Sequence, residues 1–72
     1  MPNPIKVARM SLGITQRRLA EIVGVSRTTV NHWETGRFTP SAEYMPKLAS
    51  AFGRDAEELT REILTEAALA AA

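Results

Sequence analysis

A single glycine, Gly24, separates two short segments that each place apolar residues at helical spacing. The first segment, residues 15–23, and the second, residues 26–34, both begin with a hydroxyl residue suited to an N-cap. A tight turn between two helices needs a residue that adopts positive φ, and glycine does so readily. Helices that cross steeply also need a small residue where their backbones approach, and Ala20 stands there. The pattern therefore predicts two short helices packed at a large angle.

The residues before and after this pair also predict helices and no strand. An early helix begins near the N-terminus, with Ile5, Ala8 and Leu12 expected on one apolar face, and the next glycine ends it. A fourth helix ends at Gly53, but Pro46 leaves its start open. Because proline is tolerated in a first turn and disrupts a later one, this helix begins either near residue 45 or near residue 41 with a distorted first turn.

Asp55 and Glu58 have the spacing of a capping box and predict a fifth helix. The alanine-rich residues 65–72 either extend this helix or fray, because alanine favours helix but buries little surface. The predicted fold class is thus all-α: one compact five-helix domain over residues 1–72, with its core in residues 4–64.

The composition of the 72-residue chain excludes several kinds of site. It has no cysteine, and His32 is its one histidine, so disulfides, thiolate metal sites and multi-histidine metal sites are excluded. The sequence contains no nucleophile–base pair, carboxylate dyad or glycine-rich phosphate loop, so we expect no enzyme, no cofactor and no small-molecule ligand. No apolar run approaches the roughly 20 residues of a membrane span, and the N-terminus lacks the apolar segment of a signal peptide. We therefore expect a cytoplasmic protein with no membrane partner.

The charges are unevenly distributed along the chain. Residues 1–40 carry six basic and two acidic side chains, a net charge of +4, whereas residues 41–72 carry three basic and six acidic ones, a net charge of −3. Such asymmetry favours a basic working face for a polyanion and an acidic half turned away from it. Chance clustering in a short chain is the alternative.

Residues 26–34 have two different sides when they are placed at about 100° per residue around a helix. Hydrogen-bonding groups occupy the outer side: Arg27, Asn31, Thr28 and His32, followed by Thr35 just after this segment. The inner side holds Val30, Trp33, Glu34 and Thr29. Threonine, asparagine and histidine are weaker helix formers than the Glu and Lys of ordinary solvated faces. Their directional donors and acceptors suit base edges in a major groove. A merely polar surface is the alternative.

The stretch GITQRRLAEIVGVSRTTVNHWETGRFTPS resembles the lambda-repressor-like, Cro-type (xenobiotic-response-element) helix-turn-helix family. The similarity covers roughly residues 4–64. It depends on these matching positions: Arg9, Gly13, Thr15, Gln16, Leu19, Ala20, Gly24, Val25, Ser26, Arg27, Val30, Glu34, Gly36, Pro40, Ser41, Glu58 and Leu59. The resemblance implies a five-helix DNA-binding domain of the kind found in transcriptional repressors and regulators that bind operators as dimers.

The resemblance also implies roles for individual residues. The side chains that would reach base edges are Arg27, Thr28, Asn31 and His32. Those expected at DNA phosphates are Gln16, Arg17, Thr29 and Arg37, with plain solvated charge as the alternative for the two arginines. Gln16 would also brace the recognition helix. Arg9 and Glu34 are expected to form a structural ion pair, and Trp33 to fill the core. Thr35 stands where the family commonly has asparagine, and Arg18 where it often has glutamate.

These features predict a sequence-specific double-stranded DNA-binding transcriptional regulator at the nucleoid, of repressor or Cro-like type. Residues 26–34 would enter the major groove of a pseudo-palindromic operator, and a homodimer would form, either free or only on DNA. The alternative is an antitoxin or adaptor module whose main partner is another protein. That module would use the fifth helix and the tail. A stripe of four residues either supports such a contact or simply completes the core: Leu59, Ile63, Ala67 and Ala70.

Overall fold

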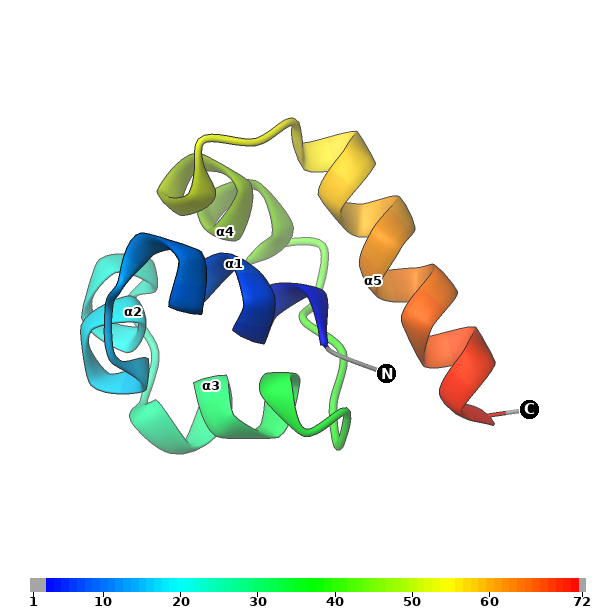
Figure 1. Ribbon diagram of the computed structural model, residues 1–72, viewed down its shortest axis with the longest axis horizontal. Helices are drawn as coiled ribbons and strands as arrows, with labels where there is room; N and C mark the ends of the chain where they lie inside the picture. The colour runs from blue at the N-terminus through cyan, green and yellow to red at the C-terminus, as the bar shows by residue number, and fades with distance from the viewer. Residues whose placement is uncertain (1–2, 72) are drawn as a thin grey trace.

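The computed structural model describes residues 3–71, with the side chains of residues 3–69, and this part of the chain forms five helices and no strand. The helices are α1 (Pro4–Leu12), α2 (Gln16–Val23), α3 (Arg27–Glu34), α4 (Met45–Phe52) and α5 (Ala56–Ala71). In Figure 1, α1 crosses the middle of the molecule, α3 runs below it, α4 lies above, and α5 extends along one side. The predicted all-α, five-helix fold is confirmed.

Side-chain caps define the starts of the first three helices. Asn3 caps α1, because its side-chain oxygen accepts hydrogen bonds from the N–H groups of Ile5 and Lys6. Thr15 and Ser26 cap α2 and α3 in the same way. Each of these oxygens pairs with backbone donors that have no partner inside the helix. The two N-caps predicted for the central helix pair are thus present.

All five helices contribute to one hydrophobic core. Its buried side chains are Ile5, Leu19, Ala20, Val23, Val30, Trp33, Met45, Leu48, Ala49, Leu59 and Ile63. The expectation that Leu12 shares the apolar face of α1 is wrong, since its side chain is 50% exposed. Leu12 is the last residue of α1, and there it lines the edge of a groove beside Phe52. The core covers the first turns of this short helix and ends before the last one.

The start of α4 follows one of the two predicted alternatives. Residues 42–44 form a turn, and α4 begins at Met45. The N–H groups of Tyr44 and Met45 both donate to the carbonyl oxygen of Ser41, at 3.0 Å and 3.2 Å. Pro46 therefore falls within the first turn, where its missing N–H would have had no helical partner.

Only half of the predicted capping box at α5 is formed. The N–H of Glu58 donates to Asp55 Oδ2 at 3.0 Å, as expected for a cap. The Glu58 carboxylate instead accepts a hydrogen bond from Arg54, which also donates to Glu62. Arg54 is a stronger partner for a carboxylate than a backbone N–H, because both groups carry charge.

The helix α5 continues through the alanine-rich tail as far as Ala71. Leu59 and Ile63, the first two residues of the proposed contact stripe, are buried and complete the core, whereas Ala67 is exposed. The side chain of Ala70 and all of Ala72 lie outside the described residues. Leu64 and Leu69 are both 53% exposed on other sides of the helix. No helix among the described residues is long and apolar enough to cross a membrane.

Candidate nucleic-acid interface

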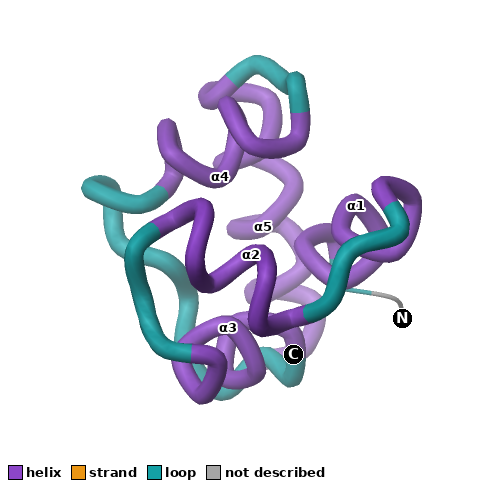
Figure 2. The backbone as a smooth tube through the Cα atoms, turned by 90° about the vertical axis from the view of Figure 1, so that its left-hand side faces the viewer, coloured by secondary structure: helices purple, strands orange, loops and turns teal. Residues whose placement is uncertain are grey.

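The helices α2 and α3 pack against one another across the turn at Gly24, and Figure 2 shows them side by side at the face turned toward the viewer. Gly24 has φ of +88°, the left-handed conformation that the sequence required of it. Its N–H and that of Val25 both donate to the carbonyl oxygen of Ala20, at 2.8 Å and 3.0 Å. The turn thus closes α2 and directs the chain into α3 within three residues.

The two sides of α3 differ in burial as the angular placement predicted. Val30, Trp33 and Glu34 are buried. The four proposed base-reading residues are more open: Arg27 and Thr28 are exposed, and Asn31 and His32 are half-buried. The structure therefore brings these four side chains to one solvent-accessible side of α3.

An ion pair between Arg9 of α1 and Glu34 of α3 lies beneath this surface. Arg9 Nε donates to Glu34 Oε2 at 2.6 Å, and Arg9 Nη2 donates to Oε1 at 3.1 Å. The side chain of Arg9 is only 14% exposed and that of Glu34 only 2% exposed. The third guanidinium nitrogen, Nη1, donates to the carbonyl oxygen of Ile14 at 2.8 Å. The hydrogen bond and charge of Glu34 raise the pKa of Arg9 against the opposing effect of burial, so the guanidinium stays charged.

Gln16 connects this ion pair to the open side of α3. Its Nε2 donates to Glu34 Oε1 at 3.1 Å and to Asn31 Oδ1 at 3.3 Å. Its Oε1 accepts from Arg27 Nη1 at 3.2 Å. The first residue of α2 therefore holds two of the proposed base-reading side chains, and its half-buried amide makes three hydrogen bonds.

The residues proposed at DNA phosphates differ in their exposure and in their hydrogen-bond partners. Arg17 and Arg37 are exposed, and neither forms an ion pair within the described part of the chain. Thr29 is half-buried and shares a hydrogen bond with the Ser26 hydroxyl at 2.9 Å. Arg18, in contrast, pairs with Glu21 at 3.2 Å. Arg17 and Arg37 thus keep exposed charges without an ion-pair partner among the described residues, as does Arg27, which donates only to the neutral amide of Gln16.

Comparison with known proteins identifies the family. A helix-turn-helix family model matches residues 5–59, which includes α1 to α4 and the start of α5. The chain belongs to the Cro-type, lambda-repressor-like helix-turn-helix family. It is therefore a DNA-binding transcriptional regulator and not an enzyme.

Individual relatives agree with this assignment. An uncharacterized HTH-type transcriptional regulator from Methanothermobacter thermautotrophicus is 45% identical over 55 residues, covering 76% of this chain and 80% of that protein. The HTH-type regulator YgzD of Bacillus subtilis is 37% identical over 59 residues, covering 82% of this chain and 89% of that protein. The crystal structure of the clp gene regulator ClgR from Corynebacterium glutamicum superposes with a TM-score of 0.75 at 29% identity, covering 94% of this chain and 72% of that one.

Sequence reasoning missed two residues that shape this interface. Asn3 Nδ2 donates to the carbonyl oxygen of Trp33 at 2.9 Å and so connects the start of α1 to the end of α3. Asparagine directly before a proline is a recognisable N-cap signal, although the contact to α3 is not local. Phe38 is 58% exposed, and its ring meets the His32 ring edge-on at 5.1 Å. Nothing in the loop sequence indicates this pairing.

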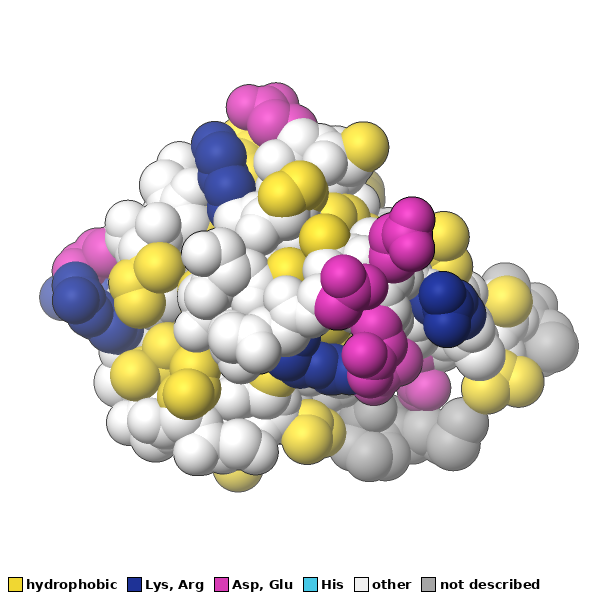
Figure 3. All heavy atoms as spheres, turned by 90° about the horizontal axis from the view of Figure 1, so that it is seen from above, with side chains coloured by type: hydrophobic (Ala, Val, Ile, Leu, Met, Phe, Trp, Pro, Cys, Tyr) yellow, Lys and Arg dark blue, Asp and Glu magenta, His cyan; other side chains and the backbone are white. Residues whose placement is uncertain are grey.

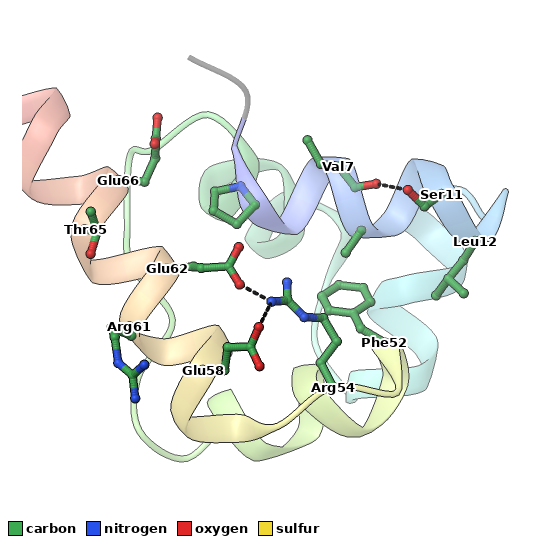
Figure 4. A pocket seen from close by; sticks show the side chains of 12 residues that line it. Val7, Ser11, Leu12, Phe52, Arg54, Glu58, Arg61, Glu62, Thr65 and Glu66 are labelled. Atoms are coloured by element: carbon green, nitrogen blue, oxygen red, sulfur yellow. Dashed lines mark hydrogen bonds and ion pairs between the residues drawn. The ribbon is translucent and has the colours of Figure 1, made fainter.

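Another groove lies between α1 and α5. It has a volume of about 770 Å³ and is lined by apolar residues of α1, by Phe52 and by glutamates of α5. Figure 4 shows Arg54 inside it, pointing toward Glu58 and Glu62, and the two glutamates raise the pKa of Arg54. From above, Figure 3 shows acidic side chains gathered over the side on which α5 lies. Within the described residues, no group of His, Cys, Asp and Glu side chains is arranged to hold a metal ion.

Proposed function

We propose that this regulator is a sequence-specific repressor or Cro-like protein that inserts α3 into the major groove of an operator at the nucleoid. One observation carries the proposal: Arg27, Thr28, Asn31 and His32 share the open side of a helix whose opposite side is fixed in the core by Val30 and Trp33. A rigid helix with a row of donors and acceptors is the geometry of direct readout.

In this proposal the surrounding residues position the protein on the DNA backbone. Arg17 and Arg37 are exposed cations beside α3, and they would contact phosphate without reading sequence. Thr29 would add a hydrogen bond to a phosphate oxygen. Both side-chain protons of Gln16 already point to Glu34 and Asn31, so a phosphate contact by Gln16 would have to replace one of these hydrogen bonds. Arg27 would make the strongest base contact, because a guanidinium reaches both acceptors on the major-groove edge of guanine.

The operator would be pseudo-palindromic if two copies bind it together. The exposed Leu64 and Leu69 of α5 supply apolar surface for a homodimer, which would form free or only on DNA. The same surface favours the second candidate function, an antitoxin or adaptor module whose main partner is another protein. Selection of bound duplexes from a random pool separates operator architectures, since two half-sites about one helical turn apart indicate a dimer.

The salt dependence of binding to duplex DNA tests the proposal. A protein that neutralises phosphates releases counterions, so its affinity should fall steeply as salt rises. Arg27→Ala should reduce binding to the selected operator and flatten the preference at one base pair, whereas Arg17→Ala should weaken all duplexes alike. The adaptor function replaces the proposed one if no duplex binding is measurable at low salt. Equal, sequence-blind losses from both variants would show that Arg27 reads no base.

A further inference from the structure

The hydrogen-bond chain through Gln16 has a fixed direction. Glu34, which is paired with Arg9, offers oxygen acceptors to its neighbours, so the Gln16 atom that meets it must be the amide nitrogen. Arg27 at the other end has donors only, so it must meet the Gln16 oxygen. The two ends require the same orientation of the amide, and rotating it by 180° would break both hydrogen bonds.

This orientation is passed on to Asn31. The second proton of Gln16 Nε2 points to Asn31, where the acceptor is Oδ1 at 3.3 Å. The Asn31 nitrogen Nδ2 therefore lies on the other side of its amide and has no acceptor among the described residues. No described side-chain nitrogen or oxygen is buried without a partner, so Nδ2 is open to solvent. The open atom of Asn31 is a donor.

We propose that the buried Arg9–Glu34 pair, acting through Gln16, sets Asn31 to present donors to the DNA, so that Asn31 reads guanine rather than adenine. The inference rests on the proposed function, because it concerns which base edge the same surface reads. Guanine presents two acceptors in the major groove, N7 and O6, which suit an amide that offers N–H groups. The favoured contact of asparagine with adenine needs both its oxygen and its nitrogen at the base edge.

The geometry makes the adenine contact less favourable here. Asn31 Oδ1 faces Gln16, and turning the amide so that both atoms meet one base edge would weaken that hydrogen bond. Gln16 would then hold one donor without its partner in a half-buried site, which costs free energy. Gln16 is thus a positioning residue: it acts on specificity through Asn31 and Arg27.

The first experiment finds the base pair that Asn31 reads. Duplexes are selected from a random pool with the wild-type protein and with Asn31→Ala, and the base pair whose preference disappears in the variant is assigned to Asn31. We expect guanine at that base pair in the wild-type selection, preferred over adenine by roughly five- to a hundredfold. A wild-type preference for adenine at that pair would overturn the inference and leave the proposed function standing.

Two variants then change the orientation of the amide. Gln16→Met keeps the length of the side chain but removes the amide, so the Asn31 amide can rotate and the guanine-to-adenine preference should fall toward one. Arg17→Gln is the matched control: it removes a charge from the next residue and should lower affinity for all duplexes without changing that ratio. An unchanged ratio in Gln16→Met contradicts the positioning role.

Asn31→Asp gives the opposite outcome. One aspartate oxygen still accepts from Gln16, and the other replaces the outward donor with an acceptor, so cytosine should become preferred over guanine at the assigned pair. Thermal unfolding shows whether the variant is folded, and the preference ratio is read only from folded protein. Retention of guanine by folded Asn31→Asp overturns the inference. If the wild-type selection enriches no sequence, the proposed function is rejected, and the inferred recognition of guanine by Asn31 is rejected with it.

Discussion

At the scale of single residues, the buried ion pair shows how a small domain accommodates charge in its interior. Arg9 and Glu34 make two hydrogen bonds to each other, and Ile14 and Gln16 provide the remaining partners. Burying such a pair is not a strong source of stability by itself, because both groups lose hydration. Its effect is to fix the relative positions of α1, α2 and α3, because each partner belongs to a different segment.

Removal of one member should therefore cost more than removal of both. Glu34→Ala leaves the Arg9 guanidinium in its site without a counter-charge, and we expect a loss of about 3–5 kcal/mol in the free energy of unfolding. The double variant Arg9→Met with Glu34→Leu removes both charges and should lose less. Urea unfolding monitored by the fluorescence of buried Trp33 measures both values. A loss in Glu34→Ala below about 1 kcal/mol would show that the partners re-pair or reach solvent.

Some side-chain contacts of the candidate site could be predicted from the sequence, and others could not. The resemblance to the family implied the Arg9–Glu34 pair and a bracing Gln16, because those positions match known motifs. It did not imply that Gln16 would direct Asn31, since that depends on which atoms of two amides face one another. The contact of Phe38 with His32 was also unpredictable, because an exposed loop residue has no periodic pattern that locates its ring.

At the scale of secondary structure, the turns determine where the helices can lie. Gly24 allows α2 to end and α3 to begin within three residues, because it adopts a left-handed conformation that other residues enter at a cost. A Cβ added to Gly24 would meet nothing within 4 Å. The requirement for glycine is therefore one of backbone conformation and not of space.

This distinction predicts an order among substitutions at Gly24. Gly24→Ala should lower the free energy of unfolding by about 1–2 kcal/mol, the cost of placing a Cβ in the left-handed region. Gly24→Asn should lose less, because asparagine tolerates that region better. Thermal or urea unfolding of the two variants gives the comparison. If a steric clash were the cause, the larger asparagine would be the more harmful residue.

Element boundaries followed from local chemistry wherever that chemistry was complete. Thr15, Ser26 and Gly24 marked the helix pair correctly, because caps and turns act within a few residues. Pro46 could not decide between two starts of α4, since the deciding hydrogen bonds go to Ser41 in a turn without a sequence signature. Leu12 was misplaced because periodicity locates the face of a helix but not the point along it where the core ends.

At the scale of the whole molecule, the two halves of the charge pattern occupy different regions. The basic residues of the first half include Arg27, the first residue of α3, and Arg37, three residues after its end. Arg17 belongs to α2, which packs against α3. The acidic residues of the second half belong mainly to α5, whose start lies at the opposite end of Figure 1 from α3. Charges separated by more than about 8 Å of solvent are largely screened at physiological salt. The small net charge of +1 is thus a poor guide to how this protein meets DNA.

Two variants that change the net charge in opposite directions can distinguish the effect of charge location on DNA affinity from the effect of net charge. Arg37→Gln removes a cation near α3, so DNA affinity should fall for every sequence and the slope of log affinity against log salt should become shallower by about one. Glu57→Gln removes an exposed anion at the start of α5 and makes the protein more positive. Because that anion is far from α3, the affinity and slope should change little at physiological salt. Titrations of one duplex at several salt concentrations provide both quantities. A gain in Glu57→Gln as large as the loss in Arg37→Gln would mean that net charge, and not its location, controls binding.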